Sequence, residues 1–142
     1  MDHQSVQHYL ATLSYRFEKT IKDAPRHFSS VDIGHGVRTP IEIVNHMNHV
    51  LRYAIHAFEK SDLSQTPLLT WGDEVECFHQ TVMRLYQLLK QGSEPHGATL
   101  EQIVQGPVSD AMTHVGQLAL LRRMADSPIS GENFMAANIR LD

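Results

Sequence analysis

The chain of 142 residues has very little cysteine and no long apolar run. A single thiol, Cys77, excludes an intramolecular disulfide and fits a reducing compartment. No window approaches the roughly 18 consecutive apolar residues that suggest a membrane span. The first ten residues, MDHQSVQHYL, also lack the apolar segment of a signal peptide. We therefore expect a cytoplasmic protein with no membrane partner.

An excess of positive charge is also missing. The chain carries 12 basic and 16 acidic residues, a formal net charge of −4. Nucleic-acid binding usually shows as a basic patch, so no nucleic-acid partner is expected. The nearest candidate is the pair Arg122-Arg123, which we interpret as the solvated end of a helix, where cations favour the helix dipole.

Common catalytic loop motifs are absent as well. The sequence has no glycine-rich phosphate loop, because Gly34-His35-Gly36 is too short to form one. Neither Ser109 nor Ser127 lies in a nucleophile-elbow pattern. Cys77 has no evident activating base and is interpreted as an inert, half-buried side chain.

What the chain does contain is a helical periodicity. Apolar residues recur at steps of three and four in segments separated by proline, glycine and serine. This predicts long helices over residues 4–23, 40–60, 71–91 and 107–125, with a short helix at 99–105. Thr39, Pro40 and Glu42 predict a capping box at the start of the second helix. Gly106-Pro107 is expected to break the chain between the short helix and the last one.

No segment shows a convincing strand pattern. The fold class predicted is therefore all-α, a four-helix bundle forming a single domain over residues 1–142, with an irregular C-terminal tail from residue 127. The linker over residues 26–38 is long enough for either an antiparallel return or a crossover. The tail would cover either the mouth of a site or a dimer seam.

Histidine is over-represented, with ten in the chain, and two of the ten, His114 and His46, stand out by their positions. Asp110 and His114 are four residues apart, so they lie one turn apart on one face of the last helix. A carboxylate and an imidazole at this spacing can chelate one ion. His46 lies at the boundary of the apolar arc of the second helix, where it can turn inward as a third ligand.

Such a set of two imidazoles and one carboxylate leaves coordination positions open. It suits Zn, Ni, Fe or Mn and does not discriminate among them. The ion would act as a Lewis acid and lower the pKa of water or of a substrate thiol. By spacing alone, however, an Asp/His pair at this distance is more often a hydrogen-bonded or ionic surface pair than a metal site, and a boundary histidine more often makes an ordinary polar contact.

Three stretches of the sequence resemble a known family. Residues 107–124 read PVSDAMTHVGQLALLRRM and resemble the last bundle helix of the DinB/YfiT-like superfamily, with its core at His114-Val115-Gly116-Gln117-Leu118. Residues 127–134, SPISGENF, resemble the tail of one bacterial branch. Residues 38–46, RTPIEIVNH, resemble the family's second helix, in which a histidine ligand closes a similar phrase.

The resemblance implies a four-helix bundle with a long connection and a divalent metal near one end of the core. The family typically uses three histidines, of which His46 matches the first and His114 the last. Asp110 stands where the middle histidine is common; an aspartate still ligates and shifts the site toward harder metals. We expect Gln117 either to contact the metal ligands without touching the ion or to face the substrate.

Relatives in this superfamily include thiol-dependent transferases and isomerases, together with members of no known activity. The expected function is therefore a metal-dependent enzyme of thiol-transferase or hydrolase type acting on a small molecule, as a homodimer. The alternative is a non-catalytic metal- or ligand-binding, stress-associated dimer, in which the same residues form a polar core network.

Overall fold

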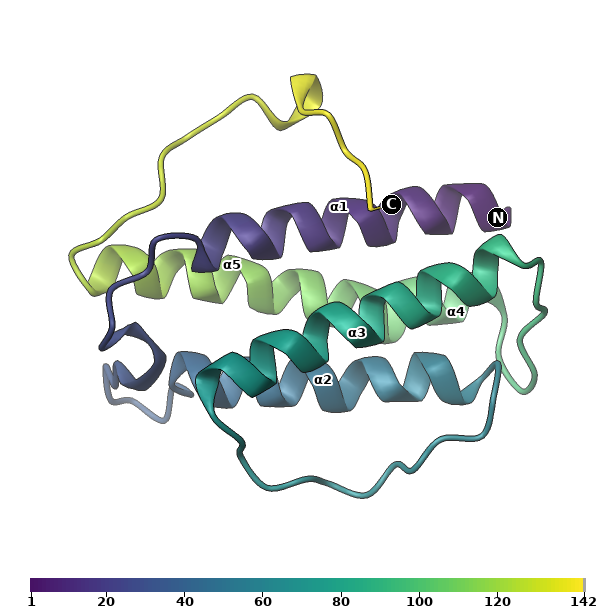
Figure 1. The fold of residues 1–142 in the computed structure, drawn as a ribbon, viewed down its shortest axis with the longest axis horizontal. Helices are drawn as coiled ribbons and strands as arrows, with labels where there is room; N and C mark the ends of the chain where they lie inside the picture. The colour runs from purple at the N-terminus through teal and green to yellow at the C-terminus, as the bar shows by residue number, and fades with distance from the viewer. Residues whose placement is uncertain (142) are drawn as a thin grey trace.

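A computed structural model describes residues 1–141, and the fold over this range is entirely helical. Four long helices account for most of it, and they are connected by irregular segments and short helical turns (Figure 1). The long helices are α1 (His3–Ile21), α2 (Pro40–His56), α3 (Trp71–Lys90) and α5 (Ser109–Met124). None of these helices combines the length and the apolar character that crossing a bilayer requires.

The four helices pack side by side around one apolar core. α1 and α2 each pack against both α3 and α5. The predicted stripes supply the core: each helix contributes residues at three- and four-residue steps whose side chains are fully enclosed, among them Leu10, Phe17, Met47, Leu51, Phe78, Leu85, Ala111 and Leu118. Phe17 of α1 stacks on Phe78 of α3 with ring centroids 3.9 Å apart.

The chain crosses the molecule between α2 and α3. Figure 1 shows that α2 runs back antiparallel to α1, so the linker that precedes α2 makes a return. The segment that follows α2 then travels the length of the molecule, and α3 runs in the same direction as α2. The long connection is therefore residues 57–70, which includes the gap between the helices predicted over residues 40–60 and 71–91.

The start of α2 is well defined. The Glu42 carboxylate accepts hydrogen bonds from the backbone N–H and the hydroxyl of Thr39, at 2.9 and 2.8 Å, as the predicted capping box requires of its acidic member. These bonds lower the pKa of Glu42. The end of α2 falls at His56, earlier than the predicted residue 60.

The prediction of a break before the last long helix is wrong, because the chain stays helical through Gly106 and Pro107. The short helix α4 (Leu100–Ile103) continues into α5 through a π-helical turn over Val104–Val108, which contains Pro107. In an α-helix the proline ring would clash with the carbonyl four residues back. The wider π turn displaces that carbonyl, so the chain passes the proline without a loop.

A buried arginine ties the ends of two helices together, which corrects the interpretation of Arg122-Arg123 as a solvated pair. Arg122 is only 4% exposed. Its guanidinium donates to the carbonyls of Thr20 and Lys22, at 3.0 and 2.9 Å, and to the carbonyl and hydroxyl of Ser127, at 2.8 and 3.0 Å. The cation thus satisfies carbonyls at the C-terminal ends of α1 and α5, where the helix dipoles favour it.

From the end of α5 to residue 141 the chain is irregular apart from a 3-10 turn at Phe134–Ala136. This tail lies over α1, at the opposite edge of the molecule from α2 (Figure 1). Glu132 accepts hydrogen bonds from Tyr15 and Lys19, at 2.8 and 2.6 Å, and the Phe134 ring lies 3.6 Å from the guanidinium carbon of Arg16. Asp142, the last residue of the predicted tail, lies outside the described residues.

Arg122→Met keeps the aliphatic stem of this side chain and removes its four hydrogen bonds. We expect the free energy of unfolding to fall by about 3 kcal/mol, because buried carbonyls lose a charged donor. Urea denaturation followed by circular dichroism measures the change. Arg123→Met, at the exposed neighbouring position, is the matched control and should change stability by less than about 0.5 kcal/mol. Equal effects of the two substitutions would contradict the role given to Arg122.

Candidate metal centre

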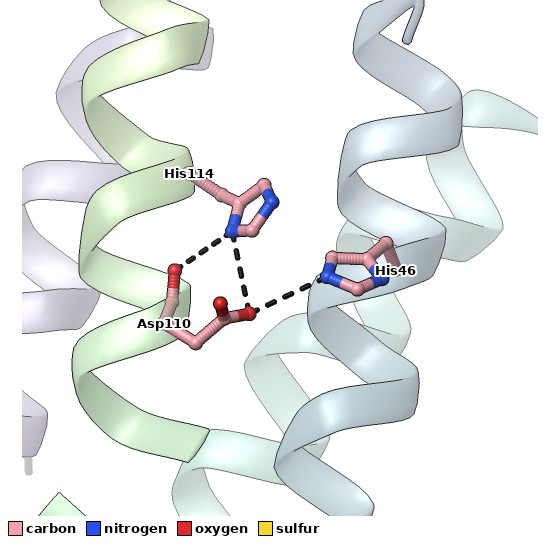
Figure 2. A group of neighbouring side chains, drawn as sticks. All are labelled: His46, Asp110 and His114. Carbon is pink, nitrogen blue, oxygen red and sulfur yellow. Dashed lines mark hydrogen bonds and ion pairs between the residues drawn. The ribbon is translucent and has the colours of Figure 1, made fainter. Parts of the chain in front are cut away.

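His46, Asp110 and His114 come together between α2 and α5. Asp110 and His114 project from successive turns of α5, and His46 faces them from α2 (Figure 2). One candidate ligand atom from each side chain can be chosen so that all three lie within 4.8 Å of one another. Among the described residues, this is the group of His, Cys, Asp and Glu side chains that meets the spacing for a metal ion. The structure therefore brings together the three residues selected from the sequence.

The local structure explains why these side chains converge. On α5 each site residue precedes a buried one, since Ala111 follows Asp110 and Val115 follows His114. On α2 the buried Met47 follows His46. Successive helical residues are turned by about 100°, so burying these apolar neighbours brings the site residues to the margin of the core.

The enclosed carboxylate oxygen of Asp110 is the most informative atom of the site. Asp110 as a whole is partly exposed, but its Oδ2 is buried and has no hydrogen-bond partner. His46 Nε2 and His114 Nδ1 each lie 3.4 Å from this oxygen, close enough for an ion pair but without hydrogen-bond geometry. An enclosed carboxylate oxygen without a hydrogen bond is costly unless a positive charge compensates it.

The distances suit a divalent ion. Two donors that are each about 2.1 Å from a tetrahedral ion lie about 3.4 Å apart. This is the separation of His46 Nε2 and Asp110 Oδ2. The rings of His46 and His114 have centroids 4.6 Å apart and are tilted by 54°, so they do not stack face to face.

A backbone contact sets the tautomer of His114. This residue is only 6% exposed, and its Nδ1 lies 2.7 Å from the backbone carbonyl oxygen of Asp110. A carbonyl accepts only, so Nδ1 carries the hydrogen and Nε2 keeps a free lone pair. An outer hydrogen bond of this kind orients metal-binding histidines in general.

The electrostatic surroundings favour the neutral form of His46. Burial lowers the pKa of His46, as do repulsion from Arg38 and from His114, and the nearby Asp110 carboxylate only partly opposes this shift. The shift favours the unprotonated imidazole. Only this form has a lone pair to offer a metal ion.

A fully buried carboxylate, that of Glu74, stabilises the position of α2 beside the site. Glu74, in the first turn of α3, is 2% exposed. It accepts hydrogen bonds from Asn45 Nδ2, Asn48 Nδ2 and the backbone N–H of Leu69, at 2.9, 3.0 and 3.0 Å. Sequence reasoning missed this contact, because an acidic residue in a first helical turn is usually solvated and stabilises the helix dipole.

Gln117 does not join the cluster. It lies one turn beyond His114 on α5, its side chain is exposed, and it has no hydrogen bond with the described residues. Its assignment as a residue behind the ligands or facing the substrate stays a prediction. Cys77 is half-buried, as expected, and its sulfur lies 3.9 Å from the Thr81 hydroxyl.

Comparison with known proteins adds no further information about this site. No family model, no curated protein and no solved structure matches the chain. The resemblance to the DinB/YfiT-like superfamily therefore rests on the sequence motifs alone.

Asp110→Asn removes a charge that no protein hydrogen bond compensates at Oδ2. In metal-free protein we expect the free energy of unfolding to stay the same or to rise, because the enclosed oxygen no longer carries a charge. Urea denaturation in the presence of EDTA measures it. Glu74→Gln is the matched control, because three donors satisfy that carboxylate. It should lower stability by about 2 kcal/mol. A similar loss in both variants would mean that Asp110 serves the fold rather than an ion.

Proposed function

We propose that this protein is a metal-dependent enzyme in which His46, Asp110 and His114 hold one divalent ion. The observation that carries the proposal is the enclosed Oδ2 of Asp110, which lies between two imidazoles and has no hydrogen bond. The identity of the ion is left open among Zn, Ni, Fe and Mn, which all accept such donors.

The three residues would divide the work of holding the ion. Asp110 supplies negative charge, and the two neutral imidazoles supply nitrogen donors without adding charge. The hydrogen bond from His114 Nδ1 to the Asp110 carbonyl keeps that ring in place. With only three protein ligands, positions remain for a substrate, which distinguishes catalytic from structural sites.

The reaction class follows from what such an ion supplies when it is bound. It is a Lewis acid and lowers the pKa of a thiol or of water that reaches it. A thiol-dependent transferase or a hydrolase acting on a small molecule is therefore the activity that we propose. The motifs in residues 38–46 and 107–134 support a bundle of the DinB-like type as its scaffold, forming one domain over residues 1–142. A cytoplasmic location stays a prediction from composition.

Elemental analysis and calorimetry test the metal site directly. We expect untagged protein dialysed with Zn, Ni or Mn to retain about one ion per chain. His114→Ala and Asp110→Ala should weaken binding by more than the roughly 10–100-fold that is typical of losing only an outer partner of a ligand. His49→Ala is the matched control, since it removes another histidine of α2 that is not one of the three proposed ligands. In cobalt-loaded protein, the visible spectrum should change when a small thiol is added, as an open position requires. Protein that retains no ion under any of these conditions would refute the proposal.

A non-catalytic dimer is the second candidate, and an exposed apolar surface on α5 favours it. Leu120 and Met124 lie one turn apart on this helix and are 57% and 52% exposed. Large apolar side chains exposed together are typical of contact surfaces. A homodimer formed through this surface is compatible with either function.

Analytical ultracentrifugation of the double variant Leu120→Lys/Met124→Lys tests the dimer. We expect wild-type protein to sediment as a dimer and the variant as a monomer, because two buried charges would oppose association. Tyr53→Lys is the matched control, since Tyr53 is a similarly exposed side chain on α2. A monomeric wild-type protein would rule the dimer out, and unchanged metal uptake in the variant would separate association from the site.

A further inference from the structure

A small polar cavity borders His46 on the side of α2 that faces the long connection to α3. Its volume is about 150 Å³. Ligand pockets for larger molecules usually exceed about 300 Å³, so this cavity accommodates a small group rather than a large ligand. Its polar lining comes from Arg38, Glu42, Asn45, His46, His49 and Gln65.

The exposed side chain of Arg38 brings a positive charge to this cavity. It forms no hydrogen bond or ion pair with any residue of the described chain, 1–141, although its charge helps to lower the pKa of Glu42 and of His46. Glu42 is the acidic residue of the lining, and its Oε1 accepts hydrogen bonds from Thr39. A guanidinium presents its donors in a planar fork that matches a carboxylate, and here the fork is free.

His46 has a ring nitrogen to offer to the same cavity. Its Nε2 faces Asp110, and the other ring nitrogen lies on the far side of the ring from Asp110 (Figure 2). Within residues 1–141 no group forms a hydrogen bond with this Nδ1. In the tautomer that carries its hydrogen on Nδ1, this nitrogen is a donor and Nε2 keeps the lone pair that an ion would take.

The two imidazoles therefore differ in their outer partners. His114 donates its Nδ1–H to a backbone carbonyl, and His46 has no such acceptor within the protein. Metal-binding histidines usually donate this second N–H to a carboxylate, a carbonyl or water. The imidazole of His46, whose Nδ1 lacks an acceptor, and the guanidinium of Arg38 border the same cavity.

We infer that this cavity is a subsite for the carboxylate group of a small organic monoacid, which accepts hydrogen bonds from Arg38 and from His46 Nδ1–H. The idea that a substrate is recognised through this carboxylate rests on the function proposed above. One cation with an acidic neighbour suits a single negative charge, whereas a phosphate near −2 normally requires more positive charge around it. The subsite borders His46, one of the three candidate ligands.

Nuclear magnetic resonance of the metal-free, untagged full chain tests the subsite with acetate as the probe. Chloride is exchanged for acetate at constant ionic strength while His46 Nδ1 and Arg38 Nε are observed. We expect saturable shifts of both nitrogens with a dissociation constant in the millimolar range. Arg38→Gln should weaken binding at least about tenfold, and Arg38→Lys should lie between this variant and the wild type.

Arg26→Gln is the matched control for the loss of charge. Arg26 is exposed, lies in the same linker before α2 and is not part of the cavity lining. It should leave acetate binding unchanged. Shifts that do not saturate, equal binding by the Arg38→Gln variant, or tighter binding of inorganic phosphate than of acetate would each overturn the inference.

Zinc calorimetry on the same proteins separates this inference from the metal site. Arg38→Gln should retain zinc, because Arg38 is not a proposed ligand. Zinc binding without saturable acetate binding would refute the subsite and leave the metal site intact. Saturable acetate binding by protein that never takes up an ion would refute the metal site and leave the subsite.

Discussion

The packing of α2 against α5 is the constraint on which the candidate site depends. His46 comes from one helix, and Asp110 and His114 come from the other, so the three meet only if both helices keep their rotation and their register. The core fixes both, because Met47, Ala111 and Val115 are buried beside the three site residues. A slip of one residue in either helix would cost apolar burial and would also separate the polar atoms. The stability of the core and the geometry of the site are therefore set by the same contacts.

Electrostatics distinguish this site from the other buried polar contacts of the molecule. Glu74 and Arg122 are each buried with several hydrogen bonds, so their charges are satisfied by the protein itself. Asp110 Oδ2 is enclosed without a hydrogen bond, and the two imidazoles beside it include one whose pKa is lowered by its surroundings. A site of this kind stabilises the fold little by itself, and a bound positive charge would compensate the enclosed oxygen.

The sequence was most informative where one helix determines the outcome. Periodicity located the four long helices, and the spacing of Asp110 and His114 placed them on one face of α5. It was less informative where a contact joins distant segments. In the sequence, Arg122 is an ordinary cation near a helix end. Only the structure shows that it binds the carbonyls of Thr20 and Lys22, which lie about one hundred positions earlier in the chain. Pro107 predicts a break in the helix when the sequence is taken alone. Its actual effect depends on whether the residues before it form a π turn, which the sequence does not indicate.

The two imidazoles also show why residue identity alone does not describe a site. His114 belongs to a motif in which both its orientation and its outer hydrogen bond are local, since Asp110 supplies the carboxylate and the backbone carbonyl. His46 depends on residues from three segments: the linker that carries Arg38, α2 itself, and the long connection that carries Gln65. Its Nε2 faces Asp110, and its Nδ1 lacks an acceptor within residues 1–141. Any acceptor that bonds Nδ1 would raise the basicity of the nitrogen that faces Asp110. Binding at the cavity and binding of an ion would then favour each other, because a coupling between two sites acts equally in both directions.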